Sequence, residues 1–171
     1  MTFWRGPSRA KECSRSKSNK QILSGKEIER KFLVNGDAYR SEAHKKEDII
    51  QGFLSSVPER TVRVRKVDNL GWITVKGMGN ASGTTRFEWE KEIPGTEAQD
   101  LLDLCEPGRI EKTRYYVKRG LHTFEVDEFQ GGNLGLVIAE IELDDETEAF
   151  EHPAWLGEEV TGQINYYNVS L

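Results

Sequence analysis

The feature that most constrains this chain is the strict alternation of charged and apolar residues in one extended segment after another. The stretch GKEIERKFLV at 25–34 places Glu27, Glu29 and Lys31 at every second position. Side chains two residues apart on a β-strand lie on the same face, so these three charges share one face. A helical period of 3.6 would spread them around a cylinder instead. The segment therefore predicts a strand with one charged face.

Five further segments repeat this alternation, and the sign of the charge changes between them. The segments are TVRVRK, FEWEKEIP, IEKTRYYVK, FEVDEF and IAEIELD. The aligned charges are Arg63 and Arg65; Glu88, Glu90 and Glu92; Lys112, Arg114 and Lys118; Glu125 and Asp127; and Glu140 and Glu142. A solvated face with cross-strand ion pairs would explain each segment taken alone. Ordinary exposed faces also carry Ser, Thr, Asn and Gln, however, so the full set requires a second explanation.

The spacing of turn residues predicts a mainly β protein of the α+β type. We expect strands at 26–34, 48–55, 59–67, 70–77, 85–93, 109–119, 121–129 and 136–144. A helix is expected in GTEAQDLLDLCEPG with Thr96 as its N-cap, and a short irregular helix through PAWLGEEV. A closed barrel of eight antiparallel strands with the charges inward would enclose a polar tunnel wide enough for one small ligand.

Such a tunnel has a definite chemistry. Buried charges are tolerated only when they are paired or bind ions. Carboxylates with few histidines favour Mg²⁺ or Mn²⁺ over zinc, and Arg and Lys side chains bind phosphate chains. On the outer faces, Ile28, Val64 and Ile141 are expected to point toward helices or loops, and Trp72 and Trp89 to pack on the outer wall.

The first residues differ from the rest of the chain. Seven of the first 26 residues are Lys or Arg and one is acidic, although the formal net charge of the chain is −5. With no apolar period, this segment predicts a disordered tail at 1–25 before one domain at 26–171. The basic tail is only a faint hint of nucleic acid, and neither nucleic acid nor a membrane is the expected partner. Cys13 and Cys105 lack metal-ligand spacing, which favours a reduced, cytoplasmic setting.

Taken together, these motifs resemble the CYTH domain, also called the triphosphate tunnel metalloenzymes. EIERK matches the ExExK signature of that family, and the resemblance continues through QGFLSSVPERTVRVR, EWEKEIP, EKTRYYV, FEVDEF, AEIEL and WLGEEVT. It covers essentially residues 26–171 and is nearest to the short bacterial members that act as inorganic tripolyphosphatases. The resemblance implies a closed eight-stranded tunnel and metal-dependent hydrolysis of the terminal phosphoanhydride of tripolyphosphate, or of a nucleoside triphosphate.

The resemblance also implies roles for individual residues. The first metal would be held by Glu27, Glu29 and Glu142. A second metal or the attacking water would be held by Glu90, Asp127 and Glu140. The triphosphate path would be lined by Lys31, Arg63, Arg65, Lys76, Lys112 and Arg114, and the expected catalytic residues are Lys31, Glu90 and Lys112. Phe53 stands where many relatives carry tyrosine, so any role of that hydroxyl is absent here.

Two other functions remain open at this point. A class IV adenylate cyclase, which makes cyclic AMP from ATP, shares the tunnel but needs a base-recognition site that the sequence does not show. A non-catalytic polyphosphate-binding module would have no need for carboxylates beside a polyanion. The expected partner is a small-molecule triphosphate, the expected cofactor is Mg²⁺ or Mn²⁺, and a homodimer is left open.

Overall fold

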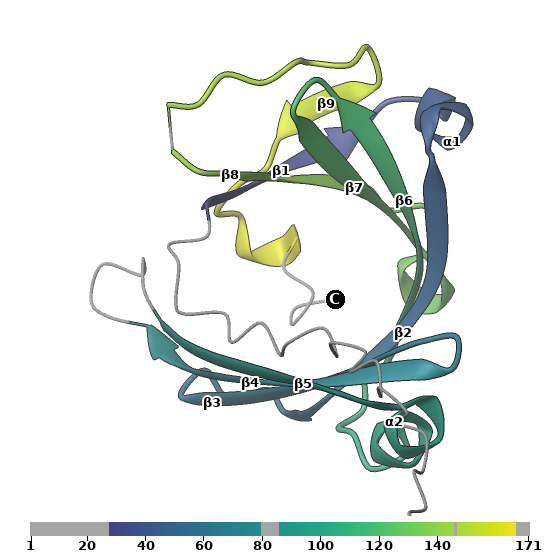
Figure 1. The fold of residues 1–171 in the computed structure, drawn as a ribbon, viewed down its shortest axis with the longest axis vertical. Coiled ribbons are helices and arrows are strands. Elements are labelled where there is room, and N and C mark those ends of the chain that lie inside the picture. The colour runs from purple at the N-terminus through teal and green to yellow at the C-terminus, as the bar shows by residue number, and fades with distance from the viewer. Residues whose placement is uncertain (1–27, 80–85, 146, 167–171) are drawn as a thin grey trace, which may run out of the picture.

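The structure, a computed structural model, describes residues 28–79, 86–145 and 147–166 (Figure 1). Its centre is one antiparallel sheet with the strand order β5-β4-β3-β2-β6-β7-β8-β1-β9. The strands are β1 (Ile28–Val34), β2 (Lys45–Ser55), β3 (Arg60–Val67), β4 (Leu70–Gly79), β5 (Arg86–Pro94), β6 (Ile110–Arg119), β7 (His122–Phe129), β8 (Val137–Leu143) and β9 (Leu156–Glu159). The helices are α1 (Ala38–Glu42) and α2 (Gly95–Leu102), with 3₁₀ turns at Gly131–Asn133 and Ile164–Tyr166.

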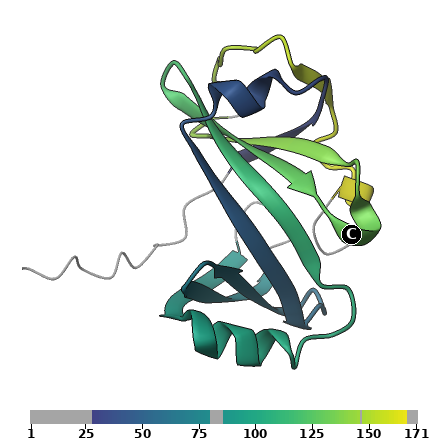
Figure 2. The same ribbon diagram turned by 90° about the vertical axis from the view of Figure 1, so that its right-hand side faces the viewer.

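The sheet bends so strongly that it forms two facing walls. Strands β3, β4 and β5 make the lower wall in Figure 1, and β7, β8, β1 and β9 make the upper one. The long strands β2 and β6, of 11 and 10 residues, run from one wall to the other (Figure 2). Because β2 and β6 pair with each other, they join the walls into one sheet with a concave inner face.

The expected closed barrel is corrected by the strand pairing. Within the described residues, β5 pairs only with β4 and β9 only with β1, so the sheet is open and has nine strands rather than eight. The mainly β fold class is confirmed. The alternation of side chains reports the face on which a residue lies, whereas closure depends on pairing between the first and last strands, which the alternation does not encode.

The largest apolar core lies outside the upper wall. Phe32, Phe124 and Ile141 are almost fully buried there, and Tyr39 of α1 and Trp155 pack against them. The Trp155 ring meets Phe124 edge-on at 5.4 Å between centroids, which is a favourable geometry for an aromatic pair. These are the outward positions of their strands, so the apolar half of the alternation is buried by α1 and by the chain around Trp155.

A second core lies between the lower wall and α2. It contains Val64, Ile93, Ala98 and Leu102. The helix approaches the sheet so closely that a Cβ on Gly71 would come within 2.3 Å of the Ala98 Cβ. These two larger apolar cores are therefore built on the convex side of the sheet.

Most of the expected elements are confirmed, with some exceptions. Ile28, Val64 and Ile141 all pack in the outer cores, as expected. The expected helix through PAWLGEEV is wrong, because Leu156–Glu159 forms β9 and pairs with β1. Helix α2 is confirmed, but it begins at Gly95 after Pro94, so Thr96 is not its N-cap. None of the helices in the described ranges is long and apolar enough to cross a membrane.

Candidate active site

The strand register brings the charged positions of the upper wall side by side on the concave face. Lys31 of β1 lies opposite Glu140 of β8, which lies opposite Glu125 of β7. Two residues further along these strands, Glu29 lies opposite Glu142. Directly opposed residues on neighbouring strands have their side chains on the same face and in contact range. The charged rows inferred from the alternation are therefore adjacent in space.

Lys31 is held between two of these carboxylates. Its Nζ donates to Glu29 at 3.0 Å and also to Glu140. Burial opposes the charged ammonium, but the carboxylates of Glu140 and Glu29 outweigh it and raise the pKa of Lys31. Glu140 is itself deeply placed, and burial together with Glu29 and Asp127 raises its pKa. Lys31 is thus a fixed cation on the concave face.

Asp127 anchors two basic side chains. Its Oδ2 accepts from Lys112 Nζ at 2.5 Å and from Arg114 Nη2 at 2.7 Å, and its Oδ1 accepts from Arg114 Nε at 2.6 Å. Asp127 is 1% exposed. Burial would raise its pKa, but Lys112 and Arg114 lower it to about 2. These contacts suit an orienting role for Asp127 better than the role of metal ligand expected from the sequence.

Arg114 joins this anchor to the rest of the upper wall. Besides Asp127 it contacts Glu125, and its Nη2 donates to Glu140 at 3.3 Å. Burial opposes its charge, but these three carboxylates raise its pKa well above the ordinary value. Glu125 received no role in the sequence analysis, although its alternation with Asp127 already placed it on the charged face.

The lower wall carries a less balanced set of charges. Arg63 and Arg65 each lie 3.9 Å from a carboxylate oxygen of Glu90, and neither has a closer carboxylate within the described ranges. Thr74 donates its hydroxyl to Glu90 at 2.7 Å. Burial and the neighbouring Arg65 lower the pKa of Arg63 despite Glu90. The two guanidinium groups therefore share one carboxylate, at a distance longer than a hydrogen bond.

Two more residues complete the lower wall. Lys76 pairs with Glu88 at 3.0 Å, next to the arginines in the register. Trp72 was expected on the outer wall, but it lies opposite Arg65 with its ring 5.0 Å from the guanidinium carbon. Trp72 therefore faces inward, because residues paired across two strands share one face. Trp89, at 45% exposed, lies outward opposite Val75.

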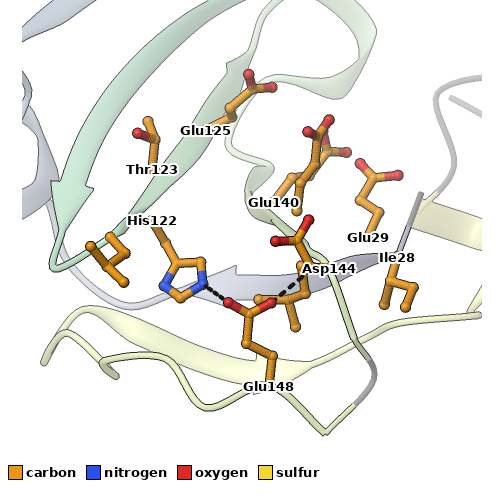
Figure 3. Close-up of a pocket in the computed structure, with 11 residues that line it drawn as sticks. Ile28, Glu29, His122, Thr123, Glu125, Glu140, Asp144 and Glu148 are labelled. Carbon is orange, nitrogen blue, oxygen red and sulfur yellow. Dashed lines mark hydrogen bonds and ion pairs between the residues drawn. The ribbon is translucent and has the colours of Figure 1, made fainter. Parts of the chain in front are cut away.

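A cavity of about 470 Å³ opens beside the acidic rows of the upper wall (Figure 3). Its lining includes the carboxylates of Glu29, Glu125, Glu140, Glu142 and Asp144. In Figure 3 the carboxylate of Glu29 lies near that of Glu140. At the outer rim, His122 Nε2 and Glu148 form a hydrogen bond of 2.8 Å. The cavity wall is thus mostly acidic, whereas the lower wall carries both acidic and basic side chains.

The donors of this cavity fit a hard divalent cation in kind. Most of its polar side chains are carboxylates, and Glu29 lies directly opposite Glu142, so a divalent cation would offset two like charges there. As the side chains stand, no three Asp, Glu, His or Cys residues in the described ranges converge closely enough to hold a metal. Glu27, the remaining expected ligand, lies outside the described residues.

The open sheet with rows of acidic and basic side chains on its concave face defines a mainly β protein with a charged interior. The chain belongs to the CYTH domain family, whose model matches residues 25–171. Membership of this family implies a divalent metal. The family expected from the sequence is therefore confirmed.

Individual relatives agree with this assignment. The chain is 50% identical over 148 residues to an "Inorganic triphosphatase" of Acetivibrio thermocellus, with 86% of this chain and 93% of the relative covered. It is 36% identical over 153 residues to an "Inorganic triphosphatase" of Nitrosomonas europaea, with 85% and 95% covered. A crystal structure of an inorganic triphosphatase matches with a TM-score of 0.60 at 32% identity, covering 84% of this chain and 92% of that one.

Proposed function

We propose that this protein is an inorganic triphosphatase that hydrolyses the terminal phosphoanhydride bond of inorganic tripolyphosphate with Mg²⁺ or Mn²⁺. The observation that carries the proposal is the pair Arg63 and Arg65, two adjacent guanidinium groups whose nearest carboxylate in the described chain is 3.9 Å away. A carboxylate at hydrogen-bond distance would satisfy them within the protein, whereas phosphate oxygens can do so from the ligand. The names of the curated relatives support the same activity.

The two walls would bind the substrate from opposite sides. Arg63, Arg65 and Lys76 belong to the lower wall and Lys31 to the upper one. Lys112 and Arg114 lie on β6, which joins the walls, and both bond Asp127 of the upper wall. Asp127 orients Lys112 and Arg114, so their charges are in place before the anion arrives. Charges that are fixed in advance stabilise a transition state at little cost in reorganisation. We assign Lys31 and Lys112 to the stabilisation of charge that develops on the phosphate chain.

Glu90 is the carboxylate best placed to hold the attacking water. It lies beside the two arginines and accepts a hydrogen bond from Thr74, which fixes its orientation. The water oxygen attacks the terminal phosphorus, the bond from that phosphorus to the bridging oxygen breaks, and pyrophosphate leaves with the electron pair. The proton of the water passes to Glu90 and then to solvent. The products are phosphate and pyrophosphate.

The acids of the upper cavity would hold the metal. Glu29 and Glu142 face each other there, and Glu27 is the third expected ligand. A divalent cation held by these carboxylates would offset charge on the phosphate oxygens. Glu140 accepts hydrogen bonds from Lys31 and Arg114, so its contribution is to position those two side chains.

Phosphate release from tripolyphosphate, ATP and pyrophosphate, each with Mg²⁺ and with Mn²⁺, tests the proposal. We expect the highest rate on tripolyphosphate and little or no cyclic AMP from ATP. Arg63→Gln should lower this rate strongly. Arg30→Gln is a matched control, because Arg30 lies on the outer face and pairs with Glu159. Cyclic AMP formed faster than phosphate is released would identify a cyclase, and tight binding of tripolyphosphate without turnover would identify a binding module.

A further inference from the structure

The concave face contains a group of buried nitrogen donors without an acceptor. Gln51 of β2 is 1% exposed, and its amide Nε2 has no hydrogen-bond partner in the described part of the chain. The same holds for the Nε atoms of Arg63 and Arg65 on the neighbouring strand β3. A buried donor without an acceptor destabilises a folded protein, so such groups in a native structure indicate a missing water or ligand.

The position of Gln51 shows where that ligand would lie. Gln51 is directly opposite Arg65 in the β2–β3 pairing, so the two side chains share the concave face. On its other side it is opposite Ile110 of β6, two residues before Lys112. Because β2 lies between β3 and β6, Gln51 lies between the arginines of β3 and the Lys112–Asp127 pair of β6 and β7.

Among the described residues, no acceptor forms a hydrogen bond with the amide nitrogen of Gln51. Ile110 belongs to an apolar cluster with Phe129 and Ile138, all three of them buried. The unsatisfied groups nearest in the register are the donors of Arg63 and Arg65. A bridging water accepts at most two hydrogen bonds and must also donate its own. An anionic oxygen needs only donors, and phosphate offers several such oxygens.

We propose that Gln51 is a substrate-binding residue whose amide NH₂ donates a hydrogen bond to a non-bridging phosphoryl oxygen of an inorganic polyphosphate. This inference rests on the proposed function and extends it to a neutral residue that the charge pattern could not reveal. An amide can hold a phosphoryl oxygen between Arg65 and Lys112 without adding a further positive charge to an already repulsive group of cations.

Two substitutions at this position separate binding from folding. Gln51→Met keeps an unbranched side chain of similar length but removes the donor, and Gln51→Glu keeps the shape but adds a negative charge toward the phosphate. Gln99→Met is the matched control, because Gln99 lies on α2, outside the sheet, and bonds Lys66 and Asp103. The measurements are KM from phosphate release with Mg²⁺, Kd for tripolyphosphate by calorimetry in EDTA, and the melting temperature without ligand.

We expect Gln51→Met to raise KM and Kd for tripolyphosphate about tenfold or more, as for loss of a hydrogen bond to a charged group. Gln51→Glu should raise both further, and Gln99→Met should leave both unchanged. Unliganded Gln51→Met should melt no lower than the wild type, because it removes an unsatisfied buried donor.

Values of KM and Kd for Gln51→Met within twofold of the wild type would overturn the inference, as would a clear fall in its melting temperature with unchanged affinity. Both results would leave the triphosphatase function standing. A wild-type protein that neither binds nor hydrolyses tripolyphosphate would remove the proposed function itself, and the inference with it.

Discussion

Replacing Asp127 by Asn should destabilise the protein strongly, although the two side chains have the same shape. The carboxylate is fully buried and accepts three hydrogen bonds from Lys112 and Arg114. Those two cations lower its pKa from 3.8 to about 2. At 1.36 kcal/mol per pKa unit, this shift corresponds to roughly 2 kcal/mol of stability from the ionised form. Removing one partner of a buried ion pair costs about 3–5 kcal/mol.

We therefore expect the free energy of unfolding of Asp127→Asn to be lower than that of the wild type by about 2–5 kcal/mol at pH 7. Urea denaturation without ligand measures it. Asp48→Asn is the matched control: Asp48 lies on β2, is exposed, and accepts one hydrogen bond from Thr113. The free energy of unfolding of Asp48→Asn should fall by less than about 1 kcal/mol, as for loss of an exposed polar contact.

The pH dependence gives a second check on Asp127. Its folded pKa is below the unfolded value, so its contribution to stability is complete well above pH 3.8 and is lost as the pH falls toward 2. The difference between wild type and Asp127→Asn should therefore shrink on acidification through this range. A loss below about 1 kcal/mol at pH 7, or a difference that does not shrink in acid, would refute the reasoning.

Three further outcomes are expected. Glu29→Gln should lower the rate of tripolyphosphate hydrolysis steeply, and added Mg²⁺ or Mn²⁺ should restore part of that rate. Glu111→Gln, at an exposed position of β6, should leave the rate unchanged. Full activity of Glu29→Gln at ordinary Mg²⁺ would exclude Glu29 as a metal ligand. Gly71→Ala should lower the melting temperature, because its Cβ would overlap Ala98 of α2; an unchanged value would mean the helix can shift freely. A chain starting at Ser24 should retain wild-type kcat and KM, and a loss of either would give the basic tail a role in catalysis.

The face on which the charged residues lie could be predicted from the sequence, because the period of two is a local property, although Trp72 was placed on the wrong face. Lys31, Arg63 and Glu140 lie on the concave face, and Val64 and Ile141 lie on the convex one. These assignments need only the direction of successive Cβ atoms along a strand. The alternation alone was therefore enough to predict which side of each strand carries the candidate site.

The partners of those residues depend on cross-strand register, which the alternation does not contain. The sequence placed Asp127 on the charged face, but only the pairing of β6 with β7 puts it opposite Arg114 and beside Lys112. Strand β9 was missed for a related reason. The segment LGEE has weak intrinsic strand preference, and its extended form comes from pairing with the edge of β1.

Apolar packing on the convex side separates the demands on neighbouring residues of each strand. In β1, Phe32 fills a core while Lys31 meets carboxylates on the other face, and in β3 the same division separates Val64 from Arg63. Folding constrains the shape of the convex-face residues, and the ligand constrains the charge of the concave-face residues. Tolerance to substitution along these strands should therefore change at every step. The ligand preference of the concave face can therefore change between related proteins while the apolar packing of the convex side is retained.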